Sequence, residues 1–174
     1  ALYADEFDDA LAAARGHASC DYYGMGMLPA GSGTVGFLWN FWHDLPYTGE
    51  AHVGLYGTSD VTLVYQAERG GRWLHVPGRP VFLDHAGRDW TRGWVNTASC
   101  VVEMGDEQRL YFSGTPVSHG FYLDPNWRPI DRWVEWSRRH GWTAGGIGFV
   151  SWPKWRLFGF EADLDIVELL FTSL

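Results

Sequence analysis

Apolar and polar residues alternate along much of this chain with the two-residue period of β-strands, and glycines interrupt the alternation at short intervals. The pattern predicts a first block of four strands, YGMGMLP (23–29), TVGFLWNFW (34–42), VTLVYQAE (61–68) and RWLHV (72–76). Glycines at 31–33 and 70–71 indicate tight turns, because glycine accepts positive φ without steric penalty. A long loop, 43–60, joins the second predicted strand to the third.

A second block repeats this plan. Its predicted strands are NTASCVVEM (96–104), QRLYFSG (108–114), GIGFVSWP (146–153) and RLFGFEA (156–162). GDE at 105–107 and PKW at 153–155 are tight turns, and a long loop fills 114–144. A repeat of this size is typical of stacked or radial β-sheet units. The sequence therefore predicts an all-β fold made of two consecutive four-stranded antiparallel sheets of the β-propeller blade type.

Helical patterns are confined to two short segments. Residues 5–15 predict a helix that Asp8 or Asp9 caps and Gly16 ends. A second helix is expected from Asp131 in the long loop of the second block. We expect a single domain, 1–174, divided into a helical lead-in (1–19), a first blade (20–80), a second blade (94–165) and an extra C-terminal strand (166–174).

Composition narrows the function classes. The 174 residues are 46% hydrophobic, which excludes disorder and allows a sizeable core. A net charge of −8 with a single lysine argues against nucleic acid as a partner, and no apolar stretch is long enough for a membrane span. We expect no signal peptide in this chain, and nothing in it indicates a compartment. We also expect no cofactor, and free thiols at Cys20 and Cys100.

The arrangement of turns places the long loops at one end of both sheets. In an up-and-down sheet the first and third turns share one end, and here both are tight, so segments 43–60, 77–93 and 114–144 gather at the other end. Elaborate loops on a rigid scaffold are where binding and catalysis usually occur. The histidines there lack a tight ligand spacing, so no metal site is expected. The candidate catalytic residues are Asp21 and Asp44, and the candidate substrate-binding residues are His43, Trp94, Asn96, His119, Tyr122 and Trp127.

The tryptophan content gives the clearest indication of a ligand class. The chain has 11 Trp, and flat aromatic rings are common in sugar-binding clefts, although the same rings also pack between sheets. Glycoside cleavage needs two carboxyl groups roughly 5–10 Å apart. Asp21 and Asp44 are the acids that could form such a pair, while Glu103 falls near the opposite end of its strand.

Several strings resemble the last two blades of five-bladed β-propeller glycoside hydrolases, the arabinanase-like and invertase-like enzymes and their relatives. They are DYYGM, GFLWNFW, GGRWLHVPGRPVFL, GWVNTASCVVEMGDEQRLYFSG and GIGFVSWPKWRLFGFEAD, within residues 20–165. The resemblance implies a carbohydrate ligand and places Asp21, Trp94 and Asn96 on strands that line a central axis. A complete five-bladed propeller is about twice as long and draws its carboxylates from several blades, so the catalytic set is not transferred.

Three functions are therefore expected and remain open. The first is a glycoside hydrolase-like propeller, or a piece of one, that binds sugar on its long-loop face. The second is a non-catalytic carbohydrate-binding or oligomerisation module of the same ancestry. The third is an unrelated two-sheet, lectin-like sandwich. Isolated sheets leave edges and apolar faces uncovered, so we expect the chain to form a homo-oligomer or to belong to a larger propeller.

Overall fold

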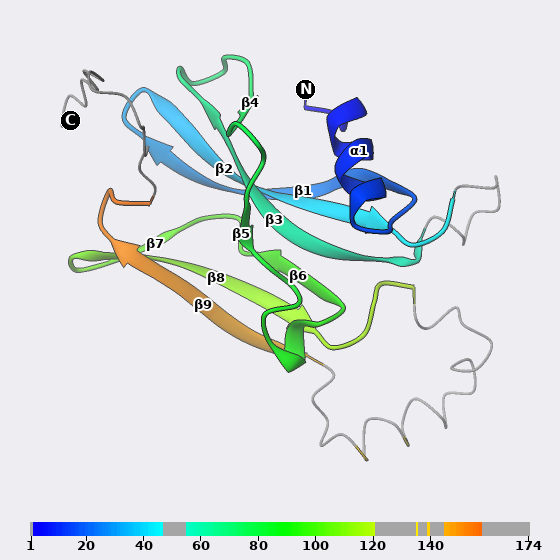
Figure 1. Cartoon of the computed structure of the whole chain (residues 1–174). Helices are drawn as coiled ribbons and strands as arrows, with labels where there is room; N and C mark the ends of the chain where they lie inside the picture. The colour runs from blue at the N-terminus through cyan, green and yellow to red at the C-terminus, as the bar shows by residue number, and fades with distance from the viewer. Residues whose placement is uncertain (1, 47–54, 121–134, 136–138, 140–144, 158–174) are drawn as a thin grey trace, which may run out of the picture.

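The computed structural model describes residues 2–46, 55–120, 135, 139 and 145–157, and these form two antiparallel β-sheets with one N-terminal α-helix (Figure 1). The all-β prediction is confirmed. The elements are α1 (Glu6–Ala14), β1 (Ser19–Ala30), β2 (Gly33–His43), β3 (Gly57–Gln66), β4 (Leu74–His75), β5 (Val81–Leu83), the short 3₁₀ helix η2 (Asp89–Thr91), β6 (Trp94–Thr97), β7 (Val102–Met104), β8 (Glu107–Thr115) and β9 (Gly146–Pro153).

The first sheet has the order β1-β2-β3-β4, and β5 also pairs with β3. The sequence predicted one fourth strand ending before residue 80, and this is wrong in detail because that strand is split and extends to Leu83. Pro77 and Pro80 have no N–H to donate to the sheet, and Gly78 and Arg79 have positive φ (74° and 46°). The intervening segment therefore bulges out before pairing resumes.

The second sheet has the order β6-β8-β7, and β9 pairs with the opposite edge of β8 along nearly its whole length, from Glu107 to Gly114. The single strand predicted at 96–104 is also split, since β6 and β7 pair with the two ends of β8 on either side of residues 98–101. In this break Met27 of β1 donates its N–H to the Ser99 carbonyl at 2.9 Å, and Met27 and Cys100 form a parallel bridge. The first strands of the two sheets thus run side by side.

The loop expected at 43–60 is shorter than predicted on its C-terminal side, because Gly57, Thr58, Ser59 and Asp60 belong to β3. These residues look like a loop in the sequence because they are small or polar. The structure accommodates their polar groups internally. Ser59 Oγ, for example, donates to the backbone carbonyl of Val95 in the second sheet.

The N-cap of α1 also differs from the prediction. Asp5, rather than Asp8 or Asp9, caps the helix and accepts hydrogen bonds from the N–H groups of Phe7 and Asp8. Asp8 completes a capping box by accepting from the Asp5 N–H at 3.0 Å. Gly16 follows the helix with φ 84°, as expected for its end. The helix predicted from Asp131 and the strands predicted at 156–162 and 166–174 lie largely or wholly outside the described residues.

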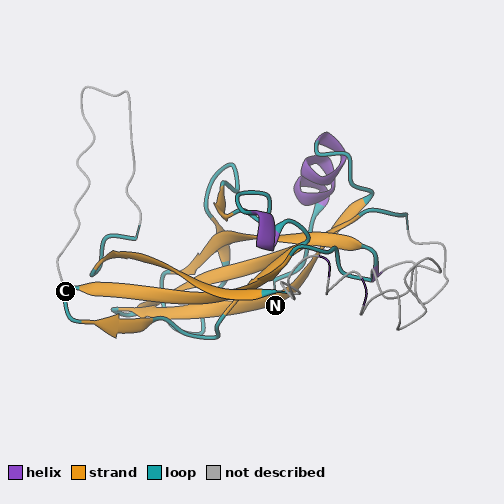
Figure 2. Ribbon diagram, turned by 90° about the horizontal axis from the view of Figure 1, so that it is seen from below, coloured by secondary structure: helices purple, strands orange, loops and turns teal. Residues whose placement is uncertain are grey.

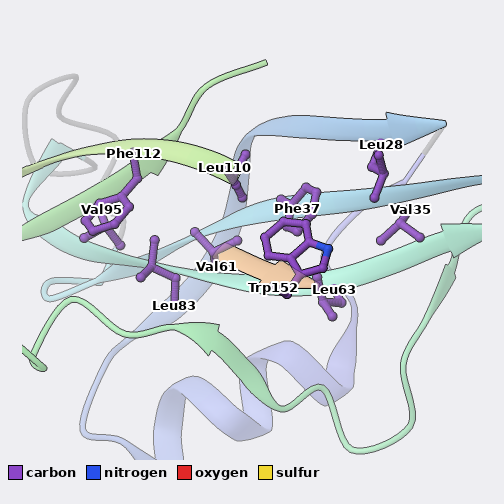
Figure 3. Packing of buried hydrophobic residues seen from close by; sticks show 10 residues of the cluster. All are labelled: Leu28, Val35, Phe37, Val61, Leu63, Leu83, Val95, Leu110, Phe112 and Trp152. Carbon is purple, nitrogen blue, oxygen red and sulfur yellow. The ribbon is translucent and has the colours of Figure 1, made fainter. Parts of the chain in front are cut away.

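The main core fills the space between the two sheets. Its buried side chains come from both, and Figure 3 shows them converging: Leu28, Val35, Phe37, Val61, Leu63, Leu83, Val95, Leu110, Phe112 and Trp152. Trp39 Nε1 adds a polar tie by donating to Thr97 Oγ1 at 2.9 Å. The first sheet lies between α1 and the second sheet, and the strands of both sheets follow the same general direction (Figure 2).

Candidate functional site

Asp21 and His43 form a hydrogen-bonded pair at the end of the first sheet to which the long loops attach. The strand register places them on neighbouring strands, with Asp21 opposite Phe41 and Ser19 opposite His43. His43 Nε2 lies 2.8 Å from Asp21 Oδ2, and the His43 ring packs edge-on against Phe41 at 4.5 Å between centroids. The His43 side chain is 12% exposed and that of Asp21 is 70% exposed. An inner, oriented imidazole thus holds a carboxylate that faces solvent.

Four rings gather beside this pair, from both sheets and the loop after β8. They are Tyr23, Phe41, Trp94 and His119, which we call the aromatic cluster. Trp94 and His119 are 4.9 Å apart, and Tyr23 contacts Trp94 at 5.3 Å and His119 at 5.5 Å. Phe41 is fully buried beneath them, Trp94 and His119 are half-buried, and Tyr23 is 47% exposed. Within the described residues the cluster joins the two sheets at this end and leaves Tyr23 partly exposed to solvent.

His119 owes its place in the aromatic cluster to backbone pairing. His119 N–H donates to the Gly57 carbonyl at 2.8 Å, and the Gly57 N–H returns a bond at 3.3 Å. The Leu55 carbonyl accepts from His119 Nδ1 at 2.8 Å. This ladder fixes the loop after β8 against the start of β3, so residues more than sixty positions apart meet.

Asp44 does not join Asp21. Its Oδ1 lies 3.1 Å from His17 Nδ1, and the His17 ring stacks on Trp42 with a centroid distance of 6.1 Å. Trp42 packs under α1 with Ala12 and Cys20, whereas Phe41 faces the aromatic cluster. Phe41 and Trp42 are successive residues of β2 and point to opposite faces of the first sheet. Through His17, Asp44 lies on the Trp42 face, whereas Asp21 pairs with His43 beside Phe41 on the other face.

The other predicted substrate-binding residues are dispersed. Asn96 accepts a hydrogen bond from Ser113 Oγ and lines a small cavity of about 230 Å³ with Tyr111 and Ile147 on the outer face of the second sheet. Tyr122 and Trp127 lie outside the described residues. The structure therefore brings together Asp21, His43, Trp94 and His119, while Asp44 and Asn96 lie elsewhere.

Sequence reasoning missed a buried polar network between α1 and the first sheet. Asp8 is 1% exposed, accepts a hydrogen bond from the Tyr22 hydroxyl, and pairs with Arg79 at 2.5 Å. The Tyr22 oxygen also lies 3.0 Å from His75 Nε2, and burial, reinforced by Arg79, lowers the pKa of His75. The sequence signal was an acid on the helix face that also carries the buried Ala12, a position that normally needs a partner.

A second part of this network surrounds Asp60, which is 3% exposed. Its carboxylate accepts from Arg15 Nη1 and from Asn40 Nδ2, each at 2.9 Å. Burial raises the pKa of Asp60, and the bonds from Asn40 and Arg15 oppose that rise. Arg15 also lies over the Trp42 ring, 4.5 Å from its centroid. The network anchors both ends of α1, and its two buried carboxylates, Asp8 and Asp60, each have hydrogen-bond partners.

Asp5 provides a test of this anchoring by pH. Two Arg79 nitrogens donate to the Asp5 carboxylate at 2.8 and 2.6 Å, and this bond is the main cause that lowers the Asp5 pKa from 3.8 to about 2. A depressed folded-state pKa adds stability above the unfolded value and loses it as the pH falls from about 4 toward 2. Carboxyl NMR titration should place Asp5 near the lower value in the native protein and near 3.8 in Arg79→Met. An unchanged titration in the variant would contradict this.

The described residues contain neither a metal-ligand cluster nor a helix that could span a membrane. No group of three or more His, Cys, Asp or Glu side chains gathers there in a way that could hold a metal ion. Within the same residues no helix has the length and apolar character required to cross a bilayer. Cys20 and Cys100 are both free thiols, the first buried in β1 and the second exposed beside Met27.

Comparison with known proteins adds no assignment: no protein-family model, no curated protein and no solved structure matches the chain.

Proposed function

We propose that this protein binds carbohydrate at the loop-rich end of its sheets, with Tyr23 as the stacking ring and Asp21 as the hydrogen-bonding carboxylate. The observation that carries the proposal is the meeting of the aromatic cluster with the Asp21–His43 pair at one end of both sheets. Flat rings pack on the apolar face of a sugar, and a carboxylate accepts bonds from its hydroxyls. Trp94 and His119 support Tyr23 from behind and fix its position.

The binding experiment compares matched tyrosines. We expect Tyr23→Ala and Asp21→Asn each to weaken binding of plant or bacterial oligosaccharides at least tenfold in titration calorimetry. Tyr3→Ala is the control, because Tyr3 is 78% exposed and takes part in none of the ring contacts given above for the aromatic cluster. Circular dichroism would establish that all variants are folded. Equal affinity of Tyr23→Ala, Tyr3→Ala and the native protein would rule out the site.

A second candidate is glycoside hydrolysis, favoured by the exposed carboxylate that His43 holds in place. Both stereochemical mechanisms need a second carboxyl group, roughly 5–10 Å from the first. Asp44 lies on the other face of the first sheet, so that group would come from another part of the protein or from an assembly. In assays with aryl glycosides and polysaccharides, this mechanism requires turnover that falls at least a hundredfold in Asp21→Asn. If the protein binds these sugars but does not hydrolyse them, glycoside hydrolysis is excluded and a non-catalytic carbohydrate-binding module is supported.

We also propose that the two sheets are blades of a larger propeller or of a homo-oligomer. The parallel bridge between Met27 and Cys100 supports this, because the innermost strands of neighbouring blades run side by side in the same direction. The outer face of the second sheet also presents Ile147, Phe149 and Val102, which are 80%, 50% and 39% exposed. Sedimentation velocity should then show species heavier than the 19.7 kDa monomer, and a strictly monomeric chain would contradict the homo-oligomer.

A further inference from the structure

The first sheet carries a cavity of about 470 Å³ that is separate from the core between the sheets. One wall is β1, where the register with β2 shifts between Tyr22 and Gly24, and the opposite wall is Trp73 in the segment that leads into β4. Gln66 and the turn glycines Gly70 and Gly71 complete the wall near Trp73. A cavity of this volume falls within the range of about 300–1,000 Å³ typical of small-molecule sites.

Trp73 lies over the first sheet at Gly36, a residue without a side chain. A Cβ on Gly36 would come within 3.0 Å of Trp73 Cζ3 and would also clash with Met25 Sδ. Gly36 therefore lets the indole approach the strands closely. The Trp73 side chain remains half-buried and lines the cavity, so a flat ring stands at its wall.

Hydrogen bonds within the protein fix two other residues of the cavity wall, Tyr22 and Gln66. The Tyr22 hydroxyl donates to the buried Asp8 and lies 3.0 Å from His75 Nε2, which holds the phenol ring in one orientation. Gln66 Nε2 donates to the Gly71 carbonyl at 2.7 Å, which ties the amide to the turn. Walls that are held by their own hydrogen bonds lose little freedom when a ligand binds.

The chemistry of the lining selects the ligand class. None of the residues that line the cavity carries a charged side chain, although the chain as a whole has a net charge of −8. Three of them are aromatic (Tyr22, Tyr23 and Trp73), and Gln66 and the glycine backbone supply neutral hydrogen-bonding groups. Charged ligands would lose hydration here without gaining an ion pair. A neutral ring with apolar faces and hydroxyl edges matches both kinds of lining.

We propose that this cavity is a second carbohydrate site, which binds a neutral saccharide of one or two rings with Trp73 as its stacking surface. It is independent of the loop-rich end, because Trp73, Gln66 and the turn at Gly70 belong to the part of the first sheet where the short connections lie. Tyr23 borders both places, so variants of Tyr23 do not distinguish them.

The test uses ¹⁵N NMR of the whole chain with methyl glycosides of glucose, galactose, xylose and arabinose and with their disaccharides. We expect a neutral probe to shift the Trp73 indole and the Gly70 and Gly71 amides. Glucuronic acid and glucosamine should bind at least tenfold more weakly. Trp73→Ala should weaken binding at least tenfold, and Trp155→Ala, which removes an indole that is 59% exposed, should leave it unchanged.

Gln66→Ala provides a second variant that keeps the indole, and a three- to tenfold loss is expected. Trp94→Ala perturbs the loop-rich end and should leave the shifts at Trp73 intact. Loss of the Gly70 and Gly71 amide shifts in Trp94→Ala but not in Trp73→Ala would overturn the cavity site while supporting the loop-end site. The cavity site would also be overturned if no sugar at millimolar concentration shifted the signals of Trp73 and Gly70. A shift of the Trp73 indole without any shift of the glycine amides would overturn it as well.

Discussion

Replacing Phe37 with alanine should lower the free energy of unfolding by about 3–5 kcal/mol, the range for truncating a fully buried phenylalanine. Phe37 is 0% exposed and sits where the two sheets meet. Its ring lies 5.3 Å from Phe82 and 6.0 Å from Trp152 of the second sheet, and Figure 3 shows it at the centre of the core. Truncation would leave a cavity between the two sheets, and hydrogen-bonded sheets cannot easily move together to fill it. The loss in free energy of unfolding should therefore fall near the upper end of this range.

Phe149→Ala is the matched control, because Phe149 is 50% exposed on the outer face of the second sheet. Its contacts are with Tyr111 and the Arg109 guanidinium, so we expect a loss below about 1 kcal/mol. Urea unfolding followed by tryptophan fluorescence would measure both. Similar losses for the two variants would show that the sheets do not depend on the Phe37 contact.

Arg79→Met should cost about 3 kcal/mol and should act mainly on α1. Arg79 is 11% exposed and pairs with two carboxylates at once, Asp5 at the helix N-cap and Asp8 one turn later. Removing the cation leaves Asp8, 1% exposed, as a buried charge with only neutral partners, and breaking a buried pair in this way typically costs about 3–5 kcal/mol. The half-exposed Asp5 places the expectation at the lower end of that range.

Arg92→Met separates this effect from the general loss of an arginine. Arg92 pairs with Asp89, but the two side chains are 69% and 90% exposed, so the change should stay within about 0.5 kcal/mol. Hydrogen exchange at the amides of α1 should increase in Arg79→Met and not in Arg92→Met. Protection of α1 that is the same in both variants would contradict the proposed anchoring.

The pattern of apolar residues was sufficient to predict β2, the body of β3, β8 and β9. β8 and β9 alternate more and less buried residues, whereas β2 and the body of β3 are mostly apolar runs that are buried on both faces. The turns at Gly31 and Gly105 could also be predicted from the sequence, since both glycines take positive φ. The short strand β5 could not be predicted, because Pro77 and Pro80 normally indicate that the chain leaves a sheet. Its pairing with β3 depends on a partner far away in the sequence.

The candidate site was predictable only in part. Asp21, His43, Trp94 and His119 were selected because the order of turns placed them at one end, and the structure brings them together. Asp44 was selected by the same rule, yet it lies on the other face of the first sheet. Its position follows from the alternation at Phe41 and Trp42 and from the His17 ring that stacks on Trp42. To predict which carboxylates lie close together, one must therefore know on which face of the sheet each acid lies, as well as at which end.

The amino-acid sequence by itself determined the class of this protein, an all-β chain with two sheets and one plain and one elaborate end, because strand period and glycine turns are local properties. The tertiary structure decided which residues meet. It placed Asp8 against Arg79, Tyr23 against Trp94, and Trp73 over Gly36. These contacts join segments that are distant in sequence, and they form because buried charges and rings need partners that only the packed sheets and helix bring within reach.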